Sequence, residues 1–291
     1  MGALALDLKE KCRDYAQLVK MRLSFLVVFS AAMAYLWATH RNVDTLTIWL
    51  LSIGGFFITG SANTFNQVIE RHSDVLMKRT ASRPLPSGRM SVLEALIFAF
   101  LLGTAGLVLL SRIHSTCAWL GAAAMITYAG IYTPMKKISA FTVIPGAVAG
   151  SLPVVIGWVA ATGEITRPAL LLFLVQFTWQ FPHTWSIAWL LNDEYSKAGL
   201  KMLPSGKKNR SAAIAIVAST FLIIPAGLLL YMYETAGIHV AWMLALAGLA
   251  MFFFSLRFYR NKTDHAAVRL MLSCFAYLPL ALVLLVAEKF L

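Results

Sequence analysis

The stretch 66–86 gathers acidic, amide and basic side chains at the end of a long apolar run. Asn66, Glu70 and Asp74 are four residues apart, so on a helix each lies about 40° round from the last and all three share one face. Carboxylate and carbonyl oxygens are the ligands that Mg²⁺ prefers. The spacing therefore predicts three oxygen-bearing groups that converge on one point.

Basic side chains follow these acids, since Arg79 and Arg83 come next, just before two prolines that end any helix. Mg²⁺ is usually held by one or two carboxylates together with substrate phosphates, and arginine binds phosphate bidentately. The combination predicts a site for a metal–diphosphate, against the alternative of a solvated helix end. Asn63, Asn66 and Gln67 lie within the same apolar run, and polar groups there favour a cavity that they face.

A second charged cluster, N-D-E-Y-S-K at 192–197, follows another apolar run that contains His183. Asp193 and Glu194 are adjacent and cannot share a helix face, so we expect one of them, Asp193, to contact a metal while the other caps the helix or pairs with Lys197. His183 follows a proline. It is a candidate heme contact, a proton-transfer group or a histidine satisfied in the core.

Between the two clusters, Tyr128 and Tyr132 are four residues apart and share a face of a predicted helix. Lys136 and Lys137 follow where that helix reaches the surface. Lysines at such a boundary are commonly topological anchors, but here we also expect them near the diphosphate, Lys136 before Lys137.

The composition of the chain indicates which kind of secondary structure positions these residues. The chain has 291 residues, of which 59% are hydrophobic and 13% charged, with a mean hydropathy of +0.72. These values exclude an ordinary soluble domain and predict an all-α polytopic membrane protein. We expect about nine transmembrane helices around a central cavity that opens to the cytoplasmic side. The predicted spans are 23–39, 46–70, 92–111, 116–133, 142–162, 168–191, 211–233, 238–257 and 268–287.

The 25 lysine and arginine residues set the expected orientation. With a cytoplasmic N-terminus, 21 of the 25 lie on the cytoplasmic side, which agrees with the positive-inside rule. The net charge of +12 is then mostly topological, and a nucleic-acid partner is not expected. We expect one domain over residues 1–291, with 1–22 as a cytoplasmic interfacial segment. Three widely separated cysteines indicate neither a disulfide framework nor a zinc site.

Four motifs resemble a known family. The run 66–85, N-x-x-x-E-x-x-x-D-x-x-M-x-R-T-x-x-R-P-L, resembles the first signature of the UbiA-type intramembrane prenyltransferases, in particular their heme O synthase branch. Y-T-P-M-K-K at 132–137, P-V-V-I-G-W at 153–158 and the segment 182–204, with P-H-T-W and N-D-E-Y-S-K-A-G-L-K-M-L-P, agree with that branch. After Arg210 only hydropathy agrees.

The sequence also departs from the family pattern. Position 70 is Glu where many relatives carry Asp, which makes Asp74 the more secure metal ligand. The quinone-prenylating branches carry a second motif with aspartates four apart, whereas Leu191 and Tyr195 flank the acids here. This difference favours heme over an aromatic quinone precursor as the acceptor.

The resemblance implies Mg²⁺-dependent transfer of a farnesyl group from farnesyl diphosphate to a vinyl group of protoheme IX (heme B), giving heme O and pyrophosphate. Each functional residue then has an expected role. Asn66, Glu70, Asp74 and Asp193 would hold Mg²⁺; Arg79, Arg83, Lys136, Lys137 and Lys197 would bind the diphosphate; and Tyr128 or His183 would face the porphyrin or direct the water.

Two alternatives stay open: prenylation of a quinone precursor by the same fold, and a polytopic transporter. The polar clusters lie at one membrane face rather than at the midplane, which argues against the transporter. The resemblance also implies membrane lipid, a heme A synthase and a terminal oxidase pathway as the surroundings of the enzyme. Without an evident transit peptide, we expect a bacterial inner membrane, with a mature organellar form as the alternative.

Overall fold

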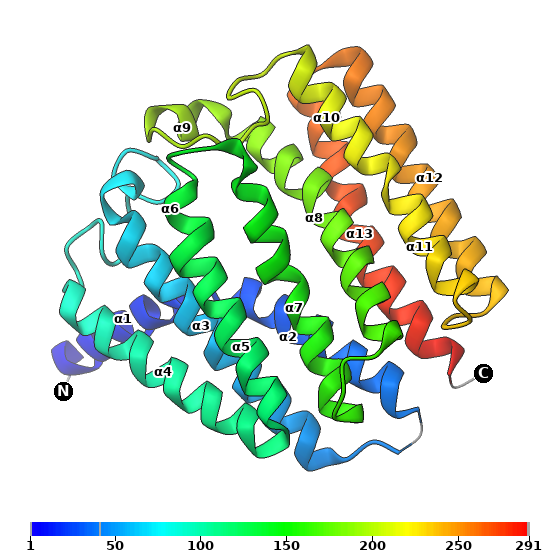
Figure 1. Cartoon of the computed structure of the whole chain (residues 1–291). Helices are drawn as coiled ribbons and strands as arrows, with labels where there is room; N and C mark the ends of the chain where they lie inside the picture. Colours follow the sequence, from blue (N-terminus) through cyan, green and yellow to red (C-terminus); the bar gives the residue numbers. More distant parts are fainter. Residues whose placement is uncertain (1, 41, 290–291) are drawn as a thin grey trace.

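The computed structural model describes residues 2–40 and 42–289, which form helices joined by loops (Figure 1). The predicted interfacial segment 1–22 corresponds to the first helix and the turn after it, apart from Met1, which lies outside the described residues. In chain order the elements are α1 (Gly2–Leu18), α2 (Met21–Thr39), α3 (Thr45–Asp74), α4 (Val92–Ile113), α5 (Ser115–Ile126), the π-helical turn η1 (Thr127–Tyr132), α6 (Thr133–Met135), the 3₁₀ turn η2 (Ala140–Thr142), α7 (Val143–Thr162), α8 (Arg167–Leu190), α9 (Asn192–Lys197), α10 (Arg210–Phe221), α11 (Ile223–Met232), α12 (Ile238–Asn261) and α13 (Asp264–Glu288).

Seven helical segments among the described residues are long and apolar enough to cross a membrane: Met21–Thr39, Thr45–Asp74, Val92–Ile113, Ala140–Thr162, Arg210–Met232, Ile238–Asn261 and Asp264–Glu288. They confirm the all-α membrane class. The predicted span 116–133 falls on α5, η1 and α6, which together form a broken helix, and 168–191 falls on α8 with its many polar residues. The count of nine spans stays a prediction.

The bundle is organised around α7, which has α3, α4 and α5 on one side and α8 with α10–α13 on the other, while α2 contacts α3, α7 and α13 (Figure 1). α7 packs directly against α2, α5, η1 and α8. It approaches α2 most closely at Gly157, where a Cβ atom would lie 2.0 Å from the carbonyl oxygen of Ala31. A side chain at this position has no room, because the obstacle is backbone.

We therefore expect Gly157→Ala to destabilise the protein by about 2–4 kcal/mol, since α2 and α7 would have to separate. Thermal unfolding in detergent measures the effect. Gly227→Ala is the matched control in another buried helix position, because its nearest neighbours are 3.5 Å away, at ordinary contact distance. Equal unfolding temperatures for the two variants would contradict the expected close packing.

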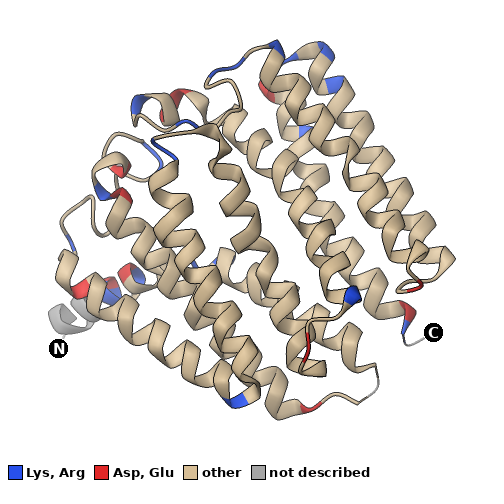
Figure 2. Ribbon diagram, viewed as in Figure 1, with Lys and Arg blue, Asp and Glu red and all other residues tan. Residues whose placement is uncertain are grey.

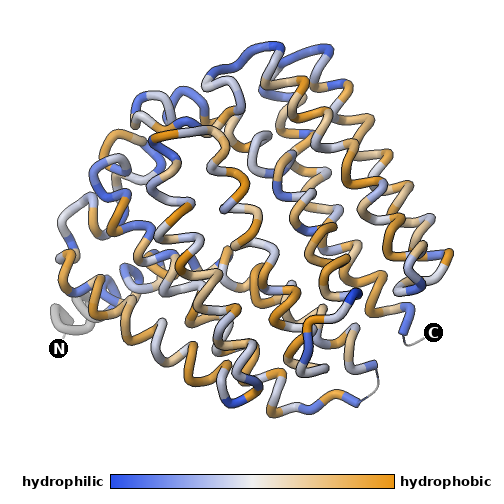
Figure 3. The backbone as a smooth tube through the Cα atoms, in the orientation of Figure 1, coloured by the Kyte–Doolittle hydropathy of each residue, from blue (hydrophilic) through white to orange (hydrophobic). Residues whose placement is uncertain are grey.

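Charged residues gather at the helix ends, as Figure 2 shows, while the helix bodies are mainly apolar in Figure 3. Many lie where α3, α6 and α8 end and α9 begins. We call this end of the bundle the charged face. A backbone hydrogen bond of 2.6 Å from the Lys201 N–H to the Lys136 carbonyl joins the loop after α9 to the loop after α6. Residues far apart in the sequence therefore meet there.

Candidate active site

The three oxygen-bearing residues of α3 lie together on its buried face, as the spacing predicts. Asn66, Glu70 and Asp74 are 1%, 6% and 0% exposed, and Asp74 is the last residue of the helix. The next residues leave the helical path, so the carboxylate of Asp74 lies at the charged face. Buried carboxylates need compensating charge, which neighbouring loops supply.

Lys136 supplies the charge for Glu70. Its Nζ donates to Glu70 Oε1 at 2.8 Å and lies 4.4 Å from the centre of the Tyr132 ring. Burial acts to lower the pKa of Lys136, but Tyr132 and the Glu70 carboxylate together raise it above its ordinary value. Lys136 therefore lies at the acids of α3 with a carboxylate as its partner, and its expected contact with the diphosphate stays a prediction.

Arg83 compensates Asp74, with 2.7 Å between Arg83 Nη1 and Asp74 Oδ2. The Thr80 hydroxyl donates to the main-chain carbonyl of Asp74 and fixes the turn that brings Arg83 back. The second carboxylate oxygen, Asp74 Oδ1, is buried and has no hydrogen-bond partner. An anionic oxygen in that state is suited to a hard cation such as Mg²⁺, so this residue fits a metal ligand.

Asn66 connects the helix to two further elements. Its Nδ2 donates to Thr133 Oγ1 at 3.0 Å, and its Oδ1 accepts from Lys20 Nζ at 2.9 Å. Lys20 joins α1 to α2, and burial with the nearby charges of Arg83 and Lys136 lowers its pKa to about 7. Sequence reasoning missed Lys20 because a lysine before an apolar run looks like an ordinary topological anchor; only the fold places it at the site.

Among the residues that the structure describes, four predicted site residues form no hydrogen bond or ion pair with this cluster. Arg79, Lys137, Asp193 and Lys197 are all exposed. Of the two adjacent acids in α9, Glu194 has a buried oxygen, Oε2, without a hydrogen-bond partner. Within 2–40 and 42–289, no group of three or more His, Cys, Asp or Glu side chains is close enough to hold a metal without other ligands.

The π-helical turn η1 presents two tyrosines to the site. Tyr128 and Tyr132 stack with their ring centres 5.2 Å apart, so the prediction that they share a face is confirmed. The Tyr128 carbonyl accepts both the backbone N–H of Thr133 and the Thr133 hydroxyl, the latter at 2.8 Å. Such π-turns are frequent at functional sites. A Cβ atom at Gly146 would lie 2.8 Å from the Tyr132 ring, so this glycine makes room for the tyrosine.

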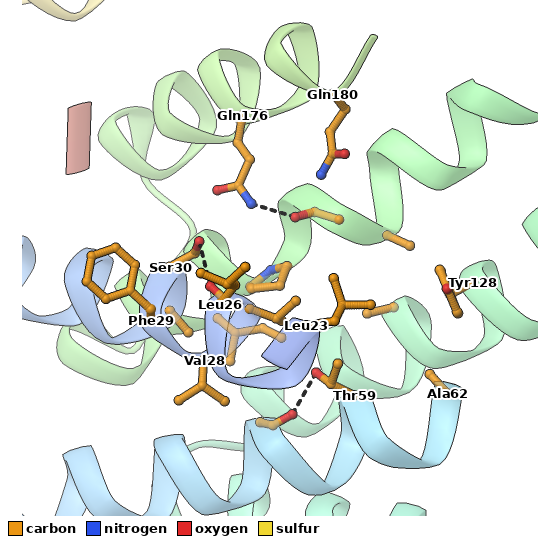
Figure 4. A pocket seen from close by; sticks show the side chains of 18 of the residues that line it. Leu23, Leu26, Val28, Phe29, Ser30, Thr59, Ala62, Tyr128, Gln176 and Gln180 are labelled. Atoms are coloured by element: carbon orange, nitrogen blue, oxygen red, sulfur yellow. Dashed lines mark hydrogen bonds between the residues drawn. The ribbon is translucent and has the colours of Figure 1, made fainter. Parts of the chain in front are cut away.

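An apolar cavity of about 320 Å³ begins beside this cluster (Figure 4). Along α3 its wall runs from Asn63, one turn before Asn66, to Leu51, and the tyrosines of η1 line it too. Figure 4 shows Gln176 and Gln180 of α8 projecting toward the apolar side chains opposite. Because Leu23 and Leu26 are exposed on α2, the cavity reaches the outer surface there. The predicted cytoplasmic opening stays a prediction.

The structure corrects the expectation that all three amides of this run face the cavity. Asn66 binds Lys20 and Thr133, and Gln67 binds carbonyls at the end of α1, so of the three amides only Asn63 lines the cavity. His183 does line it, stacked on Trp179 with ring centres 4.4 Å apart and edge-on to Phe275 at 5.0 Å. Its Nδ1 is buried without a partner, so it is not a hydrogen-bonded core histidine.

An intramembrane helical bundle with buried acids and cations beside an apolar cavity defines a class of protein that handles a lipid-like substrate with an anionic head. The comparison with protein families agrees: the model of the UbiA prenyltransferase family matches residues 27–279, and the chain belongs to this family.

The curated relatives narrow the class. A protoheme IX farnesyltransferase of Cytophaga hutchinsonii is 43% identical over 279 residues, covering 94% of this chain and 97% of the relative. One of Flavobacterium psychrophilum is 40% identical over 290 residues, covering 98% and 97%.

Solved structures show the same fold at low identity. A structure of digeranylgeranylglyceryl phosphate synthase matches with a TM-score of 0.81 and 18% identity, over 96% of this chain and 99% of that one. A UbiA homologue from Archaeoglobus fulgidus bound to GPP and Mg²⁺ matches with a TM-score of 0.75 and 17% identity, over 95% and 98%.

Proposed function

We propose that this protein is a prenyltransferase that moves the farnesyl group of farnesyl diphosphate to a vinyl group of heme B, giving heme O and pyrophosphate. The near full-length identity to protoheme IX farnesyltransferases supports this reaction. The observation that carries it is the pairing of two buried acids with cations at the mouth of an apolar cavity. That arrangement suits a substrate with an anionic head and an apolar tail.

The ion pairs suggest how the substrate enters without leaving a buried charge alone. Glu70 and Asp74 are held by Lys136 and Arg83, and Lys20 adds a third cation. The two carboxylates would hold a Mg²⁺ ion that accompanies the diphosphate, and the cations that now pair with them would bind phosphate oxygens. Each carboxylate then has a cationic partner with and without the substrate, which limits the cost of burial.

The ligands of the metal follow from the same residues. Asp74, whose Oδ1 has no hydrogen-bond partner, would hold the ion together with Glu70 and the Asn66 carbonyl, while Lys136 and Lys20 would bind phosphate. A residue of the second cluster, Asp193 as the sequence predicts or Glu194 with its buried free oxygen, completes the set. Bound Mg²⁺ supplies charge neutralisation for the leaving diphosphate.

Bond breaking and bond making then take place at the boundary between charge and cavity. The C1–O bond of the donor breaks, and Lys20, Arg83 and Lys136 stabilise the negative charge on the departing pyrophosphate, with Arg79, Lys137 and Lys197 supporting them from the surface. The allylic cation adds to the vinyl carbon of heme. Water then adds its hydroxyl group and loses a proton, which completes the hydroxyethylfarnesyl side chain. Tyr128 and His183 line this part of the cavity and are assigned to the porphyrin or to that water.

The same proposal includes the setting of the enzyme. The 1–291 domain lies in a bacterial inner membrane with its N-terminus and its charged face in the cytoplasm. Its product supplies the heme A synthase or the assembly of a terminal oxidase. The positive-inside distribution of the charges supports this orientation.

The direct test is to incubate the purified protein in lipid with heme B, farnesyl diphosphate and Mg²⁺, and to analyse the porphyrin by mass spectrometry. We expect metal-dependent hydroxyfarnesylated heme. If 4-hydroxybenzoate or a naphthoate is prenylated and heme is unchanged, the assignment of heme as the acceptor is wrong and the assignment of the donor site stands. Absence of both products and of pyrophosphate release would favour a transporter.

His183→Phe tests the acceptor side. Phenylalanine can keep the stacking on Trp179 but has no ring nitrogen, so we expect heme O formation to fall about 10²-fold, within the range for loss of a polar or proton-transfer group at a reacting centre. Farnesyl diphosphate affinity should stay within about twofold. His239→Phe, at an exposed site on α12, serves as the control. Unchanged turnover in His183→Phe would mean that His183 only packs in the cavity wall.

A further inference from the structure

We propose that Gln67 and Asn63 are positioning residues: they hold the corner between α1 and α2 so that the Lys20 ammonium meets the diphosphate of the donor. The inference rests on the proposed function, because it takes a prenyl diphosphate as the ligand of this site. It assigns a role to two buried amides that point away from the acids of α3.

The contacts run from α3 to the end of α1, to the turn after it and to the start of α2. Gln67 Nε2 donates to the carbonyls of Gln17 and Leu18, at 3.2 and 2.8 Å. Asn63 Nδ2 donates to the Val19 carbonyl and to Ser24 Oγ, both at 3.4 Å. The Gln17 and Leu18 carbonyls lie in the last turn of α1, where helix carbonyls lack their usual intrahelical partners. The Gln17 carbonyl also accepts from the Lys20 N–H at 3.3 Å, and the Val19 carbonyl from Ser24 Oγ at 2.6 Å. α3 therefore acts as the C-terminal cap of the preceding helix.

The two amides use only their donor ends. Gln67 Oε1 and Asn63 Oδ1 are both buried and lack hydrogen-bond partners. A buried acceptor without a partner is destabilising, so a residue chosen for stability alone would not carry one. Two such residues one helical turn apart, both aimed at the same chain reversal, indicate that the position of this reversal matters.

The reversal places Lys20 in an unfavourable backbone conformation. Its φ and ψ are 49° and 60°, in the left-handed region that residues other than glycine seldom adopt. This conformation turns the chain from α1 into α2 and sends the side chain to Asn66, where Nζ lies 2.9 Å from Oδ1. Strained residues persist only where their surroundings hold them, and the amides of α3 hold this turn together with Ser24, which bonds the Val19 and Lys20 carbonyls.

Packing on α3 supports the same corner. Gly60 lies one turn before Asn63, and a Cβ atom there would be 3.0 Å from Val19 Cγ1 and 3.3 Å from Val19 Cβ. Val19 is β-branched and 5% exposed, so it has little freedom to turn away. The glycine lets the corner lie against α3, and the two amides then fasten it.

A double-mutant cycle tests whether Gln67 acts through Lys20. We expect the KM for farnesyl diphosphate to rise about tenfold in Lys20→Met and about fivefold in Gln67→Met, with the KM for heme unchanged. The KM of the double variant should equal that of Lys20→Met alone, because displacing the Lys20 ammonium has no effect once the ammonium is absent. Ile69→Met, on the exposed face of the same helix, is the control. Effects that multiply to about fiftyfold would overturn the proposal.

Gly60→Ala gives a second test that removes no polar group and remains available if Gln67→Met does not fold. It should displace the corner and raise the KM for farnesyl diphosphate about threefold to tenfold, again without adding to Lys20→Met. An unchanged KM in this variant would count against the proposal. Direct measurement of farnesyl diphosphate binding with Mg²⁺ distinguishes a failure of this proposal from a failure of the proposed function. If heme is not prenylated but the affinity for farnesyl diphosphate falls in these variants, the proposed acceptor is wrong and the positioning role stands.

Discussion

Asp74→Asn is expected to lower heme O formation by about 10³-fold, the loss seen when a group that stabilises transition-state charge is removed. The asparagine has the same shape, so it can still receive the Arg83 hydrogen bond through its carbonyl oxygen. It replaces the free, buried Oδ1 by an amide or leaves it neutral, and in either case the charge that attracts the metal is gone. Turnover measured against Mg²⁺ concentration should show that added metal does not restore the rate.

The control for this variant is Asp264→Asn at the N-terminus of α13. That acid pairs with Lys208 in an exposed position, with the Asp264 side chain 62% exposed, and it lies outside the cluster. It should leave turnover within about twofold, because an exposed pair contributes little. If Asp74→Asn also stays within tenfold of the wild type, Asp74 is not the principal metal ligand.

Lys136→Met is expected to destabilise the protein by about 3–5 kcal/mol, because it leaves the Glu70 carboxylate buried without its partner. The side chains of the pair are 11% and 8% exposed, so water cannot replace the lost cation easily. Turnover should also be lost, since the same ammonium is assigned to the leaving pyrophosphate. Thermal unfolding and heme O formation are measured on the same preparation.

Adding Glu70→Gln to Lys136→Met separates the two effects. A neutral pair of similar size removes the unpaired charge, so most of the lost stability should return while turnover stays absent. Lys208→Met, which breaks the exposed pair with Asp264, should cost less than about 1 kcal/mol and leave activity intact. If the double variant regained turnover as well as stability, the Lys136–Glu70 pair would have a purely structural role.

These variants test one feature of the proposed site: each group of α3 that is assigned to the metal is bound to a basic side chain in the structure. Asp74 and Glu70 each hold one cation, and Asn66 holds a third. Because each of the two carboxylates has a cationic partner, both can be buried next to an apolar cavity before the substrate binds. The proposed exchange of partners then creates the metal site only together with the diphosphate.

Much of this organisation can be predicted from the sequence. The apolar runs predict the helices, since backbone groups in a bilayer must be satisfied within each segment. The positions of Asn66, Glu70 and Asp74 predict a common face, because neighbours within one helix are determined by its 3.6-residue period. The same reasoning places Tyr128 and Tyr132 together. Each of these relations lies within a single element, where spacing alone determines proximity.

The tertiary structure decided which of the many basic residues serve the site. Lys20 and Lys136 contact residues of α3 that are 46 and 66 positions away along the chain, while Arg79 and Lys137, which belong to the motifs, remain exposed. It also turned Gln67 from a supposed cavity residue into a cap for α1. Contacts between elements depend on how the helices pack and on where each loop reverses the direction of the chain, and neither can be predicted from a local sequence pattern.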